Sequence, residues 1–347
     1  GIFPVASAVI GDTFPVERRG AALGLIGAVF GIAFILGPIL GGLLLGLGWQ
    51  WLFAINLPIA AVVAVMAWRL LPHEPGQPGA RFDSAGMVAL GVALAGLALG
   101  LGAFDTGNVL ASLARPEVFG WLLVSIAAWV LLILIERRAE NPVFPLALFG
   151  RRQLRLGFVL TAGAGLGEAA MVFLPLLAVA GLGVSTGTAS WLLMPVVAAM
   201  SVGSPTVGRL LDKLGSRTVI VAGVAVMTAG VFLLGWAATS LWLFIVAGVL
   251  IGLGLSALLG APIRYVTLNE TTADERSAAQ GLVTIFTSMG QLLGAAAVGA
   301  VAASAPGVTG YANAFTMIGV VGLALLVASF WLKSRAQEQA GVTSPHA

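Results

Sequence analysis

The feature that most constrains this chain is a succession of long apolar runs separated by short polar gaps. A helix needs roughly 20 apolar residues to cross a membrane, because the hydrocarbon core is about 30 Å thick. By this criterion the sequence predicts ten complete membrane-spanning helices, and residues 1–12 resemble the end of an eleventh. The predicted spans are 21–47, 50–71, 84–104, 118–135, 156–180, 187–208, 217–237, 240–263, 278–303 and 311–332. The predicted fold class is therefore an all-α integral membrane protein, with the lipid bilayer as its first partner.

Basic side chains indicate which face of the membrane each polar gap occupies, since Lys and Arg accumulate in cytoplasmic loops. If residues 13–20 are cytoplasmic, the alternating direction of the spans makes five further segments cytoplasmic. These are 72–83, 136–155, 209–216, 264–277 and the tail from 333. These segments and their helix edges hold every Lys and Arg except Arg115. The pattern predicts a cytoplasmic C-terminus. It also explains the pI of 9.9 without a nucleic-acid partner, because the charges form no nucleic-acid-binding motif.

Several kinds of site are excluded by the residues that the chain lacks. There is no Cys, so neither a disulfide nor a thiolate metal site can form. The two histidines, His73 and His346, lie in polar segments, and no P-loop for ATP is present. We therefore expect no metal and no cofactor, and any transport would draw on an ion gradient.

An internal repeat adds information about topology. Residues 19–25 reappear in similar form as residues 276–282, each time where a predicted span leaves the cytoplasm. Repeats with the same membrane orientation indicate two halves related by an axis along the membrane normal. The matching spans are eight helices apart instead of six. Two extra helices are therefore predicted between the halves, at 84–104 and 118–135.

Glu168 lies near the middle of a predicted span, about 12 residues or about 18 Å from its cytoplasmic end. A carboxylate at that depth costs at least about 2.5 kcal/mol on insertion scales, so we expect it to face a cavity or a partner. Desolvation favours the protonated form of a carboxyl group. Glu168 is therefore predicted to be a proton-coupling site that a cationic substrate could also contact. The alternative is a protonated Glu hydrogen-bonded across a helix interface.

Two segments resemble motifs of the major facilitator drug exporters. The first follows the antiporter pattern G-x8-G-x3-G-P-x2-G-G, with Ala in place of its second Gly. Its residues are Gly24, Ala33, Gly37, Pro38, Gly41 and Gly42. Small residues let a neighbouring backbone approach, and Pro38 can bend the helix. The second resembles the cytoplasmic loop motif of the superfamily, in the copy expected in the second half. Its residues are Gly208, Asp212, Lys213, Gly215 and Arg217.

The segments around the inserted pair, residues 82–86 and 141–149, resemble the fourteen-helix drug:proton antiporters of the EmrB/QacA type. This resemblance implies a major facilitator fold of two helix bundles, truncated at the N-terminus by three helices. The implied divisions are 1–71 for the rest of the N-terminal bundle, 72–155 for the inserted pair and its loops, 156–335 for the C-terminal six-helix bundle, and 336–347 for a cytoplasmic tail.

Other charged residues are weaker candidates for a gate. Asp212 and Arg217 flank a tight turn, where a charge relay between helix ends could hold one conformation, or could simply cap those ends in solvent. A matching gate could come from Asp12, Glu17, Arg18 and Arg19, which are otherwise interfacial charges. Arg264, which follows Pro262, is expected to snorkel to the membrane surface.

The resemblance implies a secondary transporter, not an enzyme, that exports drugs or other amphipathic or cationic small molecules in exchange for protons. A bacterial-type plasma (inner) membrane is the expected location, and a periplasmic adaptor protein is an optional partner. Two alternatives stay open: a proton-coupled importer or facilitator on the same fold, and a non-transporting sensor or assembly subunit. The antiporter motif argues against the first, and the absence of an appended soluble domain in the sequence argues against the second.

Overall fold

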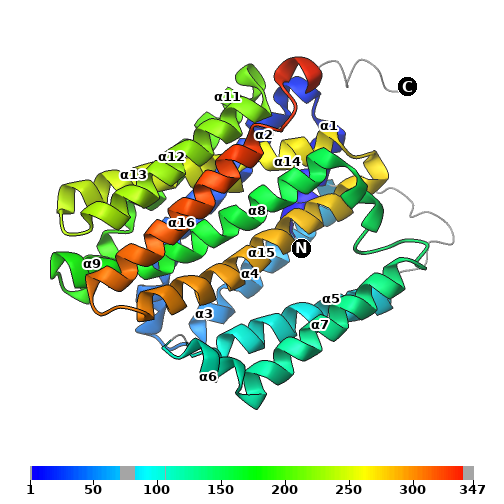
Figure 1. Cartoon of the computed structure of the whole chain (residues 1–347). Coiled ribbons are helices and arrows are strands. Elements are labelled where there is room, and N and C mark those ends of the chain that lie inside the picture. The colour runs from blue at the N-terminus through cyan, green and yellow to red at the C-terminus, as the bar shows by residue number, and fades with distance from the viewer. Residues whose placement is uncertain (1, 71–82, 106, 339–347) are drawn as a thin grey trace. The chain divides into compact units, whose positions relative to one another are not determined.

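The computed structural model describes residues 2–70, 83–105 and 107–338, and every regular element among them is a helix (Figure 1). Nine helical segments of this described part are long and apolar enough to cross a membrane. They are Trp51–Leu70, Ser84–Gly102, Pro116–Glu136, Arg152–Leu182, Thr186–Leu214, Ser216–Ala237, Leu241–Asn269, Ala273–Ala303 and Val308–Ser329. The predicted all-α membrane fold is thereby confirmed. The remaining predicted span, 21–47, coincides with the 30-residue helix α2 (Val16–Leu45), and α1 (Ile2–Thr13) is a shorter apolar helix.

The chain divides into two compact units, of which Ile32–Phe82 is the smaller. Its described part holds the second half of α2, α3 (Trp51–Ala54) and α4 (Asn56–Leu70). None of the residues of α4 is buried, although all but two of them, Asn56 and Arg69 near its ends, are apolar. An apolar helix of this kind is stable only when lipid or further apolar helices surround it.

The larger unit comprises Gly1–Gly31 and Asp83–Ala347. It contains the inserted pair α5 (Ser84–Gly102) and α7 (Pro116–Glu136), joined through α6 (Val109–Leu113). The pair packs closely because Gly96 and Gly100 bring α5 against the backbone of α7. The Ser125 hydroxyl donates to the Ala93 carbonyl at 2.7 Å across the contact. Interhelical hydrogen bonds of this type stabilise helix pairs where lipid supplies no hydrophobic driving force.

After the short helix η1 (Leu146–Gly150), the rest of the larger unit is a bundle of kinked helices, seen in green to red in Figure 1. Its elements are α8 (Arg152–Ala170), η2 (Met171–Phe173), α9 (Leu174–Leu182), α10 (Thr186–Trp191), α11 (Met194–Leu214), α12 (Ser216–Ala237), α13 (Leu241–Leu259), α14 (Ala261–Asn269), α15 (Ala273–Ala303) and α16 (Val308–Ser329). Helices α8, α15 and α16 pack side by side.

The short helix α14 is enclosed by other helices of this bundle. It is separated from α13 by an irregular residue, Gly260, and begins with Pro262 in its first turn. Its residues 261–268 are all buried, and it packs against α8, α11, α12, α13 and α15. The break at Gly260 thus redirects the end of a long span into the interior.

Close approach of α8 and α15 depends on glycine. A Cβ at Gly165 would clash with the Thr287 carbonyl oxygen, and one at Gly290 would clash with the Ala162 carbonyl oxygen. A Cβ at Gly294 would lie 2.8 Å from the Leu166 Cα. All three obstacles are backbone atoms, which cannot rotate away as a side chain can. The two helices can therefore cross at this distance only with glycine at these positions.

We predict that Gly290→Ala lowers stability by about 1–3 kcal/mol, because the added methyl group must push the two backbones apart. The measurement is the apparent melting temperature of the purified protein in detergent. Gly281→Ala on the same helix is the matched control, since a Cβ there meets no described atom within 4 Å. It should be neutral or stabilising by up to about 1 kcal/mol through helix propensity. Equal effects of the two substitutions would contradict the packing argument.

Candidate functional site

Glu168 lies near the C-terminal end of α8, just before the backbone tightens into the 3₁₀ turn η2. Alternate glycines lead up to it, and each faces a different neighbour. A Cβ at Gly163 would meet Leu325 of α16, one at Gly165 would meet α15, and one at Gly167 would lie 3.3 Å from the Met227 sulfur of α12. The glycine run therefore lets three helices close around α8 and fixes the position of the carboxyl group.

The Glu168 side chain is half-buried, and it interacts with the side chain of Gln291 on α15. It is thus neither sealed inside the bundle nor fully exposed on its surface. An amide can donate to a carboxylate and accept from a carboxylic acid. Gln291 can therefore stabilise Glu168 in both protonation states. The sequence pattern singled out Glu168 but gave no sign of this partner.

The antiporter motif and the loop motif contact each other. The Asp212 carboxylate of α11 accepts hydrogen bonds from the Gly20 and Ala21 amides of α2, both at 3.0 Å. One turn further along, a Cβ at Gly24 would lie 3.0 Å from the Gly208 Cα. Gly24 of the antiporter motif and Gly208 and Asp212 of the loop motif therefore form one helix crossing.

The repeat-related arginines Arg19 and Arg276 converge on one carbonyl group at the end of α1. Arg19 donates to the Gly11 carbonyl oxygen at 2.6 Å, and Arg276 donates to the same oxygen at 3.2 Å. Arg276 also forms an ion pair with Asp12. Cations are favourable at a helix C-terminus, where the carbonyl groups lack intrahelical partners. Arg19 in addition donates to the Asn269 side chain at 3.3 Å, which ties α2 to α14.

These contacts form what we call the closed end, defined by Gly11, Asp12, Arg19, Asp212 and Arg276. It lies at the end of the bundle that the sequence predicts to be cytoplasmic. Of the predicted gate residues, the structure brings Asp12, Arg19 and Asp212 into this cluster, whereas Arg18 is exposed. The side chain of Glu17 lies outside the described part. Arg276, notable in the sequence only as part of the repeat, supplies the partner of Asp12.

The other residues of the loop motif lie in the turn between α11 and α12. Gly215 adopts φ 83°, a left-handed conformation that favours glycine. Lys213 is exposed and Arg217 half-buried, and the described residues include no ion pair between Asp212 and Arg217. The Asp212 carboxylate instead satisfies backbone amides.

The segment after α16 covers this turn. Arg335 donates to the Lys213 carbonyl oxygen at the end of α11, and Glu338 accepts from the Ser216 hydroxyl and amide at the start of α12. Burial raises the pKa of Glu338, and the hydrogen bonds from Ser216 oppose that change. Arg335 thus lies at the C-terminal end of α11, where the helix dipole favours a cation. Glu338 lies at the N-terminal end of α12, where the dipole favours an anion.

The remaining antiporter residues belong to the smaller unit. Ala33 and Gly37 are exposed, and a Cβ at Gly37 or Gly41 would meet no described atom within 4 Å. At Pro38 and Gly42 the structure describes only the helical backbone of α2. The structure therefore assigns contacts only to Gly24 among the motif's small residues.

Comparison with known proteins identifies the family. The sequence profile of the Major Facilitator Superfamily matches residues 1–178 and 156–346. The chain belongs to the major facilitator superfamily. It is 33% identical over 300 residues to the "Uncharacterized MFS-type transporter YfiU" of Bacillus subtilis, covering 84% of this chain and 58% of that protein. It is 29% identical over 315 residues to the "Multidrug transporter protein MdtP" of the same organism, covering 86% and 56%.

The solved structure of the human organic anion transporter MFSD10 (TETRAN) has a TM-score of 0.65 at 15% identity, covering 94% of this chain and 67% of that one. At this identity the likeness shows the fold alone. The chain is a multi-pass membrane protein of the superfamily. It spans somewhat more than half the length of the curated relatives named above.

One residue of this major facilitator protein differs from expectation. Arg264 does not snorkel to the membrane surface; it is only 9% exposed, on the enclosed helix α14. Its guanidinium donates to Gln280 of α15 at 3.2 Å, and Gln280 donates back to the Arg264 carbonyl at 2.9 Å. The expectation was wrong because the break at Gly260 turns this segment inward. The sequence signal that could have pointed to this pair is the position of Gln280, one helical turn after Arg276 on α15.

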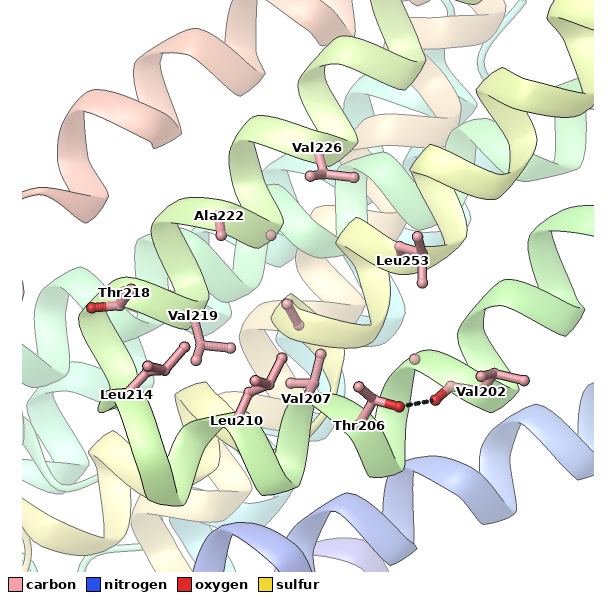
Figure 2. Close-up of a pocket in the computed structure, with 13 residues that line it drawn as sticks. Val202, Thr206, Val207, Leu210, Leu214, Thr218, Val219, Ala222, Val226 and Leu253 are labelled. Carbon is pink, nitrogen blue, oxygen red and sulfur yellow. Dashed lines mark hydrogen bonds between the residues drawn. The ribbon is translucent and has the colours of Figure 1, made fainter.

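Two hollows on the described surface are lined mainly by apolar residues. A groove of about 340 Å³ lies between α11, α12 and α13, where Figure 2 shows Val207, Leu210 and Val226 among its lining side chains. A larger hollow of about 630 Å³ is lined by α1, α2 and α11 residues, including Arg18 and Arg209. Glu168 lines neither, so neither hollow is the carboxyl site. No group of three or more His, Asp or Glu that could hold a metal occurs in the residues described.

We predict that Asp212→Asn loosens the closed end, because an amide nitrogen cannot accept from a backbone amide as the second carboxylate oxygen does. Loss of one hydrogen bond to a charged group costs about 1.5–3 kcal/mol. The ratio of closed to open molecules should therefore fall by about tenfold or more. The measurement is the distance between two spin labels, one on α2 and one on α11. They are attached to Cys residues introduced at Arg18 and Arg209, which is possible because the chain has no native Cys. Lys213→Gln, on the same turn but exposed, is the control. An unchanged distance distribution in Asp212→Asn would refute the role of Asp212.

Proposed function

We propose that the whole protein is a proton-coupled exporter of amphipathic or cationic small molecules, with Glu168 as its coupling carboxyl group. The single observation that carries this proposal is the half-buried Glu168 carboxyl on the glycine-lined crossing of α8 and α15, beside Gln291. Ionisable side chains within membrane spans are rare and typically mark proton, ion or substrate pathways. Proton uptake from one side and release to the other supplies the energy for export.

The geometry suggests how the carboxyl group and the closed end communicate. Gln291 and Arg276 both belong to α15 and are separated by about 22 Å along the helix axis. Near the Arg276 end, Arg151 forms a bidentate pair with Glu275, with both N···O distances 2.8 Å. The crossing and this pair fasten α8 to α15 at two levels. We infer that the two helices move as one body when Arg276 leaves Asp12 and Gly11.

The names of several relatives support export. "Multidrug transporter protein MdtP" and "Multidrug resistance protein 3" of Bacillus subtilis, and "Multidrug resistance protein Stp" of Mycobacterium tuberculosis, match 86% of this chain each at 26–29% identity. The helix pair α5 and α7 between the repeats favours the fourteen-helix drug:proton antiporter type. The predicted domain divisions, the cytoplasmic C-terminus, the inner-membrane location and an adaptor partner belong to this proposal. The use of the proton gradient as energy source, without a cofactor, is also part of this proposal.

We predict that Glu168→Gln abolishes proton-driven export in the whole protein, because an amide cannot gain or lose a proton. The measurement is counterflow of protons and a lipophilic cation in proteoliposomes with an imposed pH gradient. Glu117→Gln, an exposed acid in the first turn of α7, is the matched control and should transport normally.

The outcomes separate the competing functions. Transport by Glu168→Gln that still follows the pH gradient would refute the coupling role. Proton and substrate moving in the same direction in the unmodified protein would indicate an importer instead. Absence of flux with every tested cation, in protein that is folded and inserted, would favour a non-transporting role.

A further inference from the structure

The apolar groove between α11, α12 and α13 takes no part in the proposed function. Helices α11 and α12 each pack closely against α13 and only weakly against each other. Glycine makes this packing possible. A Cβ at Gly203 of α11 would lie 2.5 Å from the Ser256 Oγ of α13. One at Gly223 of α12 would lie 2.3 Å from the Ala257 Cβ of α13. The groove therefore has α13 as its floor and α11 and α12 as its walls.

The groove is apolar along its length. Its lining consists of aliphatic residues and glycine apart from Thr206 and Thr218. The Thr206 hydroxyl donates to the Val202 carbonyl oxygen of its own helix at 2.8 Å, so it is already satisfied (Figure 2). Large lining side chains are nevertheless exposed, among them Val202 at 69% and Leu214 at 46%. An exposed apolar surface of this kind favours an apolar neighbour.

The dimensions of the groove suit one extended hydrocarbon chain. On α11 the lining runs from Val202 to Leu214, which are 12 positions or about 18 Å apart along the helix axis. Half of the hydrocarbon core of a bilayer is about 15 Å thick. A volume of about 340 Å³ over about 18 Å gives a mean cross-section of roughly 19 Å². A helix, about 10–12 Å across, needs roughly 80 Å² or more, so the groove is too narrow to hold one.

One end of the groove lies at the turn between α11 and α12. Figure 2 shows Leu214 and Thr218 at this end and Val202 at the other. Lys213 is exposed and lies three residues after Leu210 of the lining, which places it on nearly the same side of α11. None of the ion pairs among the described residues involves Lys213. A cation without an acidic partner therefore stands at the end of an apolar groove.

The charged residues around this end leave an excess of positive charge. Besides Lys213, the turn and the segment that covers it carry three cations and two acids: Arg209, Arg217, Arg335, Asp212 and Glu338. Both acids already accept backbone amides. Basic groups between membrane helices bind anionic lipid head groups. The charge thus complements a lipid whose head group is negative.

We propose that the groove binds one acyl chain of an anionic phospholipid from the leaflet at the turn between α11 and α12, with Lys213 contacting the phosphate group. The aliphatic lining takes the chain. The exposed Thr218 hydroxyl, which has no partner among the described residues, can donate to a phosphate oxygen. Glu168 does not line the groove, so this proposal does not depend on the coupling role of Glu168.

The test is native mass spectrometry of the full chain, purified in mild detergent and incubated with phosphatidylglycerol or with phosphatidylcholine of the same acyl chains. The unmodified protein should retain one phosphatidylglycerol more tightly than phosphatidylcholine. Lys213→Gln should lower the affinity for phosphatidylglycerol about fivefold, the factor that one basic residue contributes near an anionic lipid surface. Arg155→Gln is the charge-matched control, because Arg155 is exposed near the start of α8 and does not line the groove.

A second variant tests the groove itself. Ala222→Phe places a ring among the lining residues and should weaken binding of phosphatidylglycerol by about tenfold or more, since loss of two buried methylene groups already has that effect. Ala229→Phe is the matched control, because Ala229 is exposed on the same helix and lies outside the lining. Melting temperatures in lipid-free detergent show whether both Phe variants fold. Lys213→Gln leaves the packing of the helices unchanged, so it tests the proposal even if Ala222→Phe does not fold.

Four results would overturn the proposal. No retained phospholipid would mean that the groove binds none. Equal retention of both lipids, unchanged in Lys213→Gln, would mean that the head group is not recognised. Dimers that Ala222→Phe prevents would identify a second copy of the chain as the occupant. Displacement of the retained phosphatidylglycerol by a lipophilic cation that competes in the same groove would identify a substrate site instead.

Discussion

Helices of this protein meet where glycine removes the side chain between them. In a bilayer, lipid tails are as apolar as leucine, so helix association depends on close van der Waals contact and interhelical hydrogen bonds. The crossings of α8 with α15 and of α2 with α11 both place glycine opposite backbone atoms. The positions of two candidate functional groups in the larger unit follow from these two crossings. One positions Glu168 beside Gln291, and the other brings the Asp212 carboxylate to the amides of α2.

The closed end is built from many weak contacts instead of one strong one. The Asp12 side chain is 51% exposed in its pair with Arg276, and such pairs contribute about 0–1 kcal/mol. Two amide hydrogen bonds to Asp212 and two arginine contacts to the Gly11 carbonyl add to it. Under the proposed function the closed end opens in each transport cycle. It can then be held by no more than a few kcal/mol, because a ligand shifts a conformational equilibrium only by its differential affinity. The two repeat-related arginines also share one acceptor, the Gly11 carbonyl oxygen.

Polar groups inside the bundle fall into two classes. Gln280 and Arg264 bind each other reciprocally, and Gln291 accompanies Glu168, so these groups have partners. Asp83 and Glu136 each leave one buried oxygen unpaired. Buried polar groups are normally satisfied, so an unpaired one indicates a proton, ion or strain at that position.

Apolar runs of the required length, with charges confined to the gaps, determined from the sequence alone that this chain is an all-α membrane protein. Glu168 could be singled out for the same reason, since a charge within a span is costly wherever the helices pack. The glycine motifs indicated close contacts, because only the absence of a side chain permits them. Which backbone each glycine meets was decided by the tertiary structure. Gly24 faces Gly208 because α2 and α11, far apart in sequence, are neighbours. Arg264 is buried, not snorkelled, because Gly260 redirects its helix, and Asp83 meets Glu136 because the start of α5 packs beside the end of α7. The local sequence specifies how long each apolar segment is and which charges it carries. Which residues contact each other across dozens of positions in the sequence depends on how the helices are arranged in space.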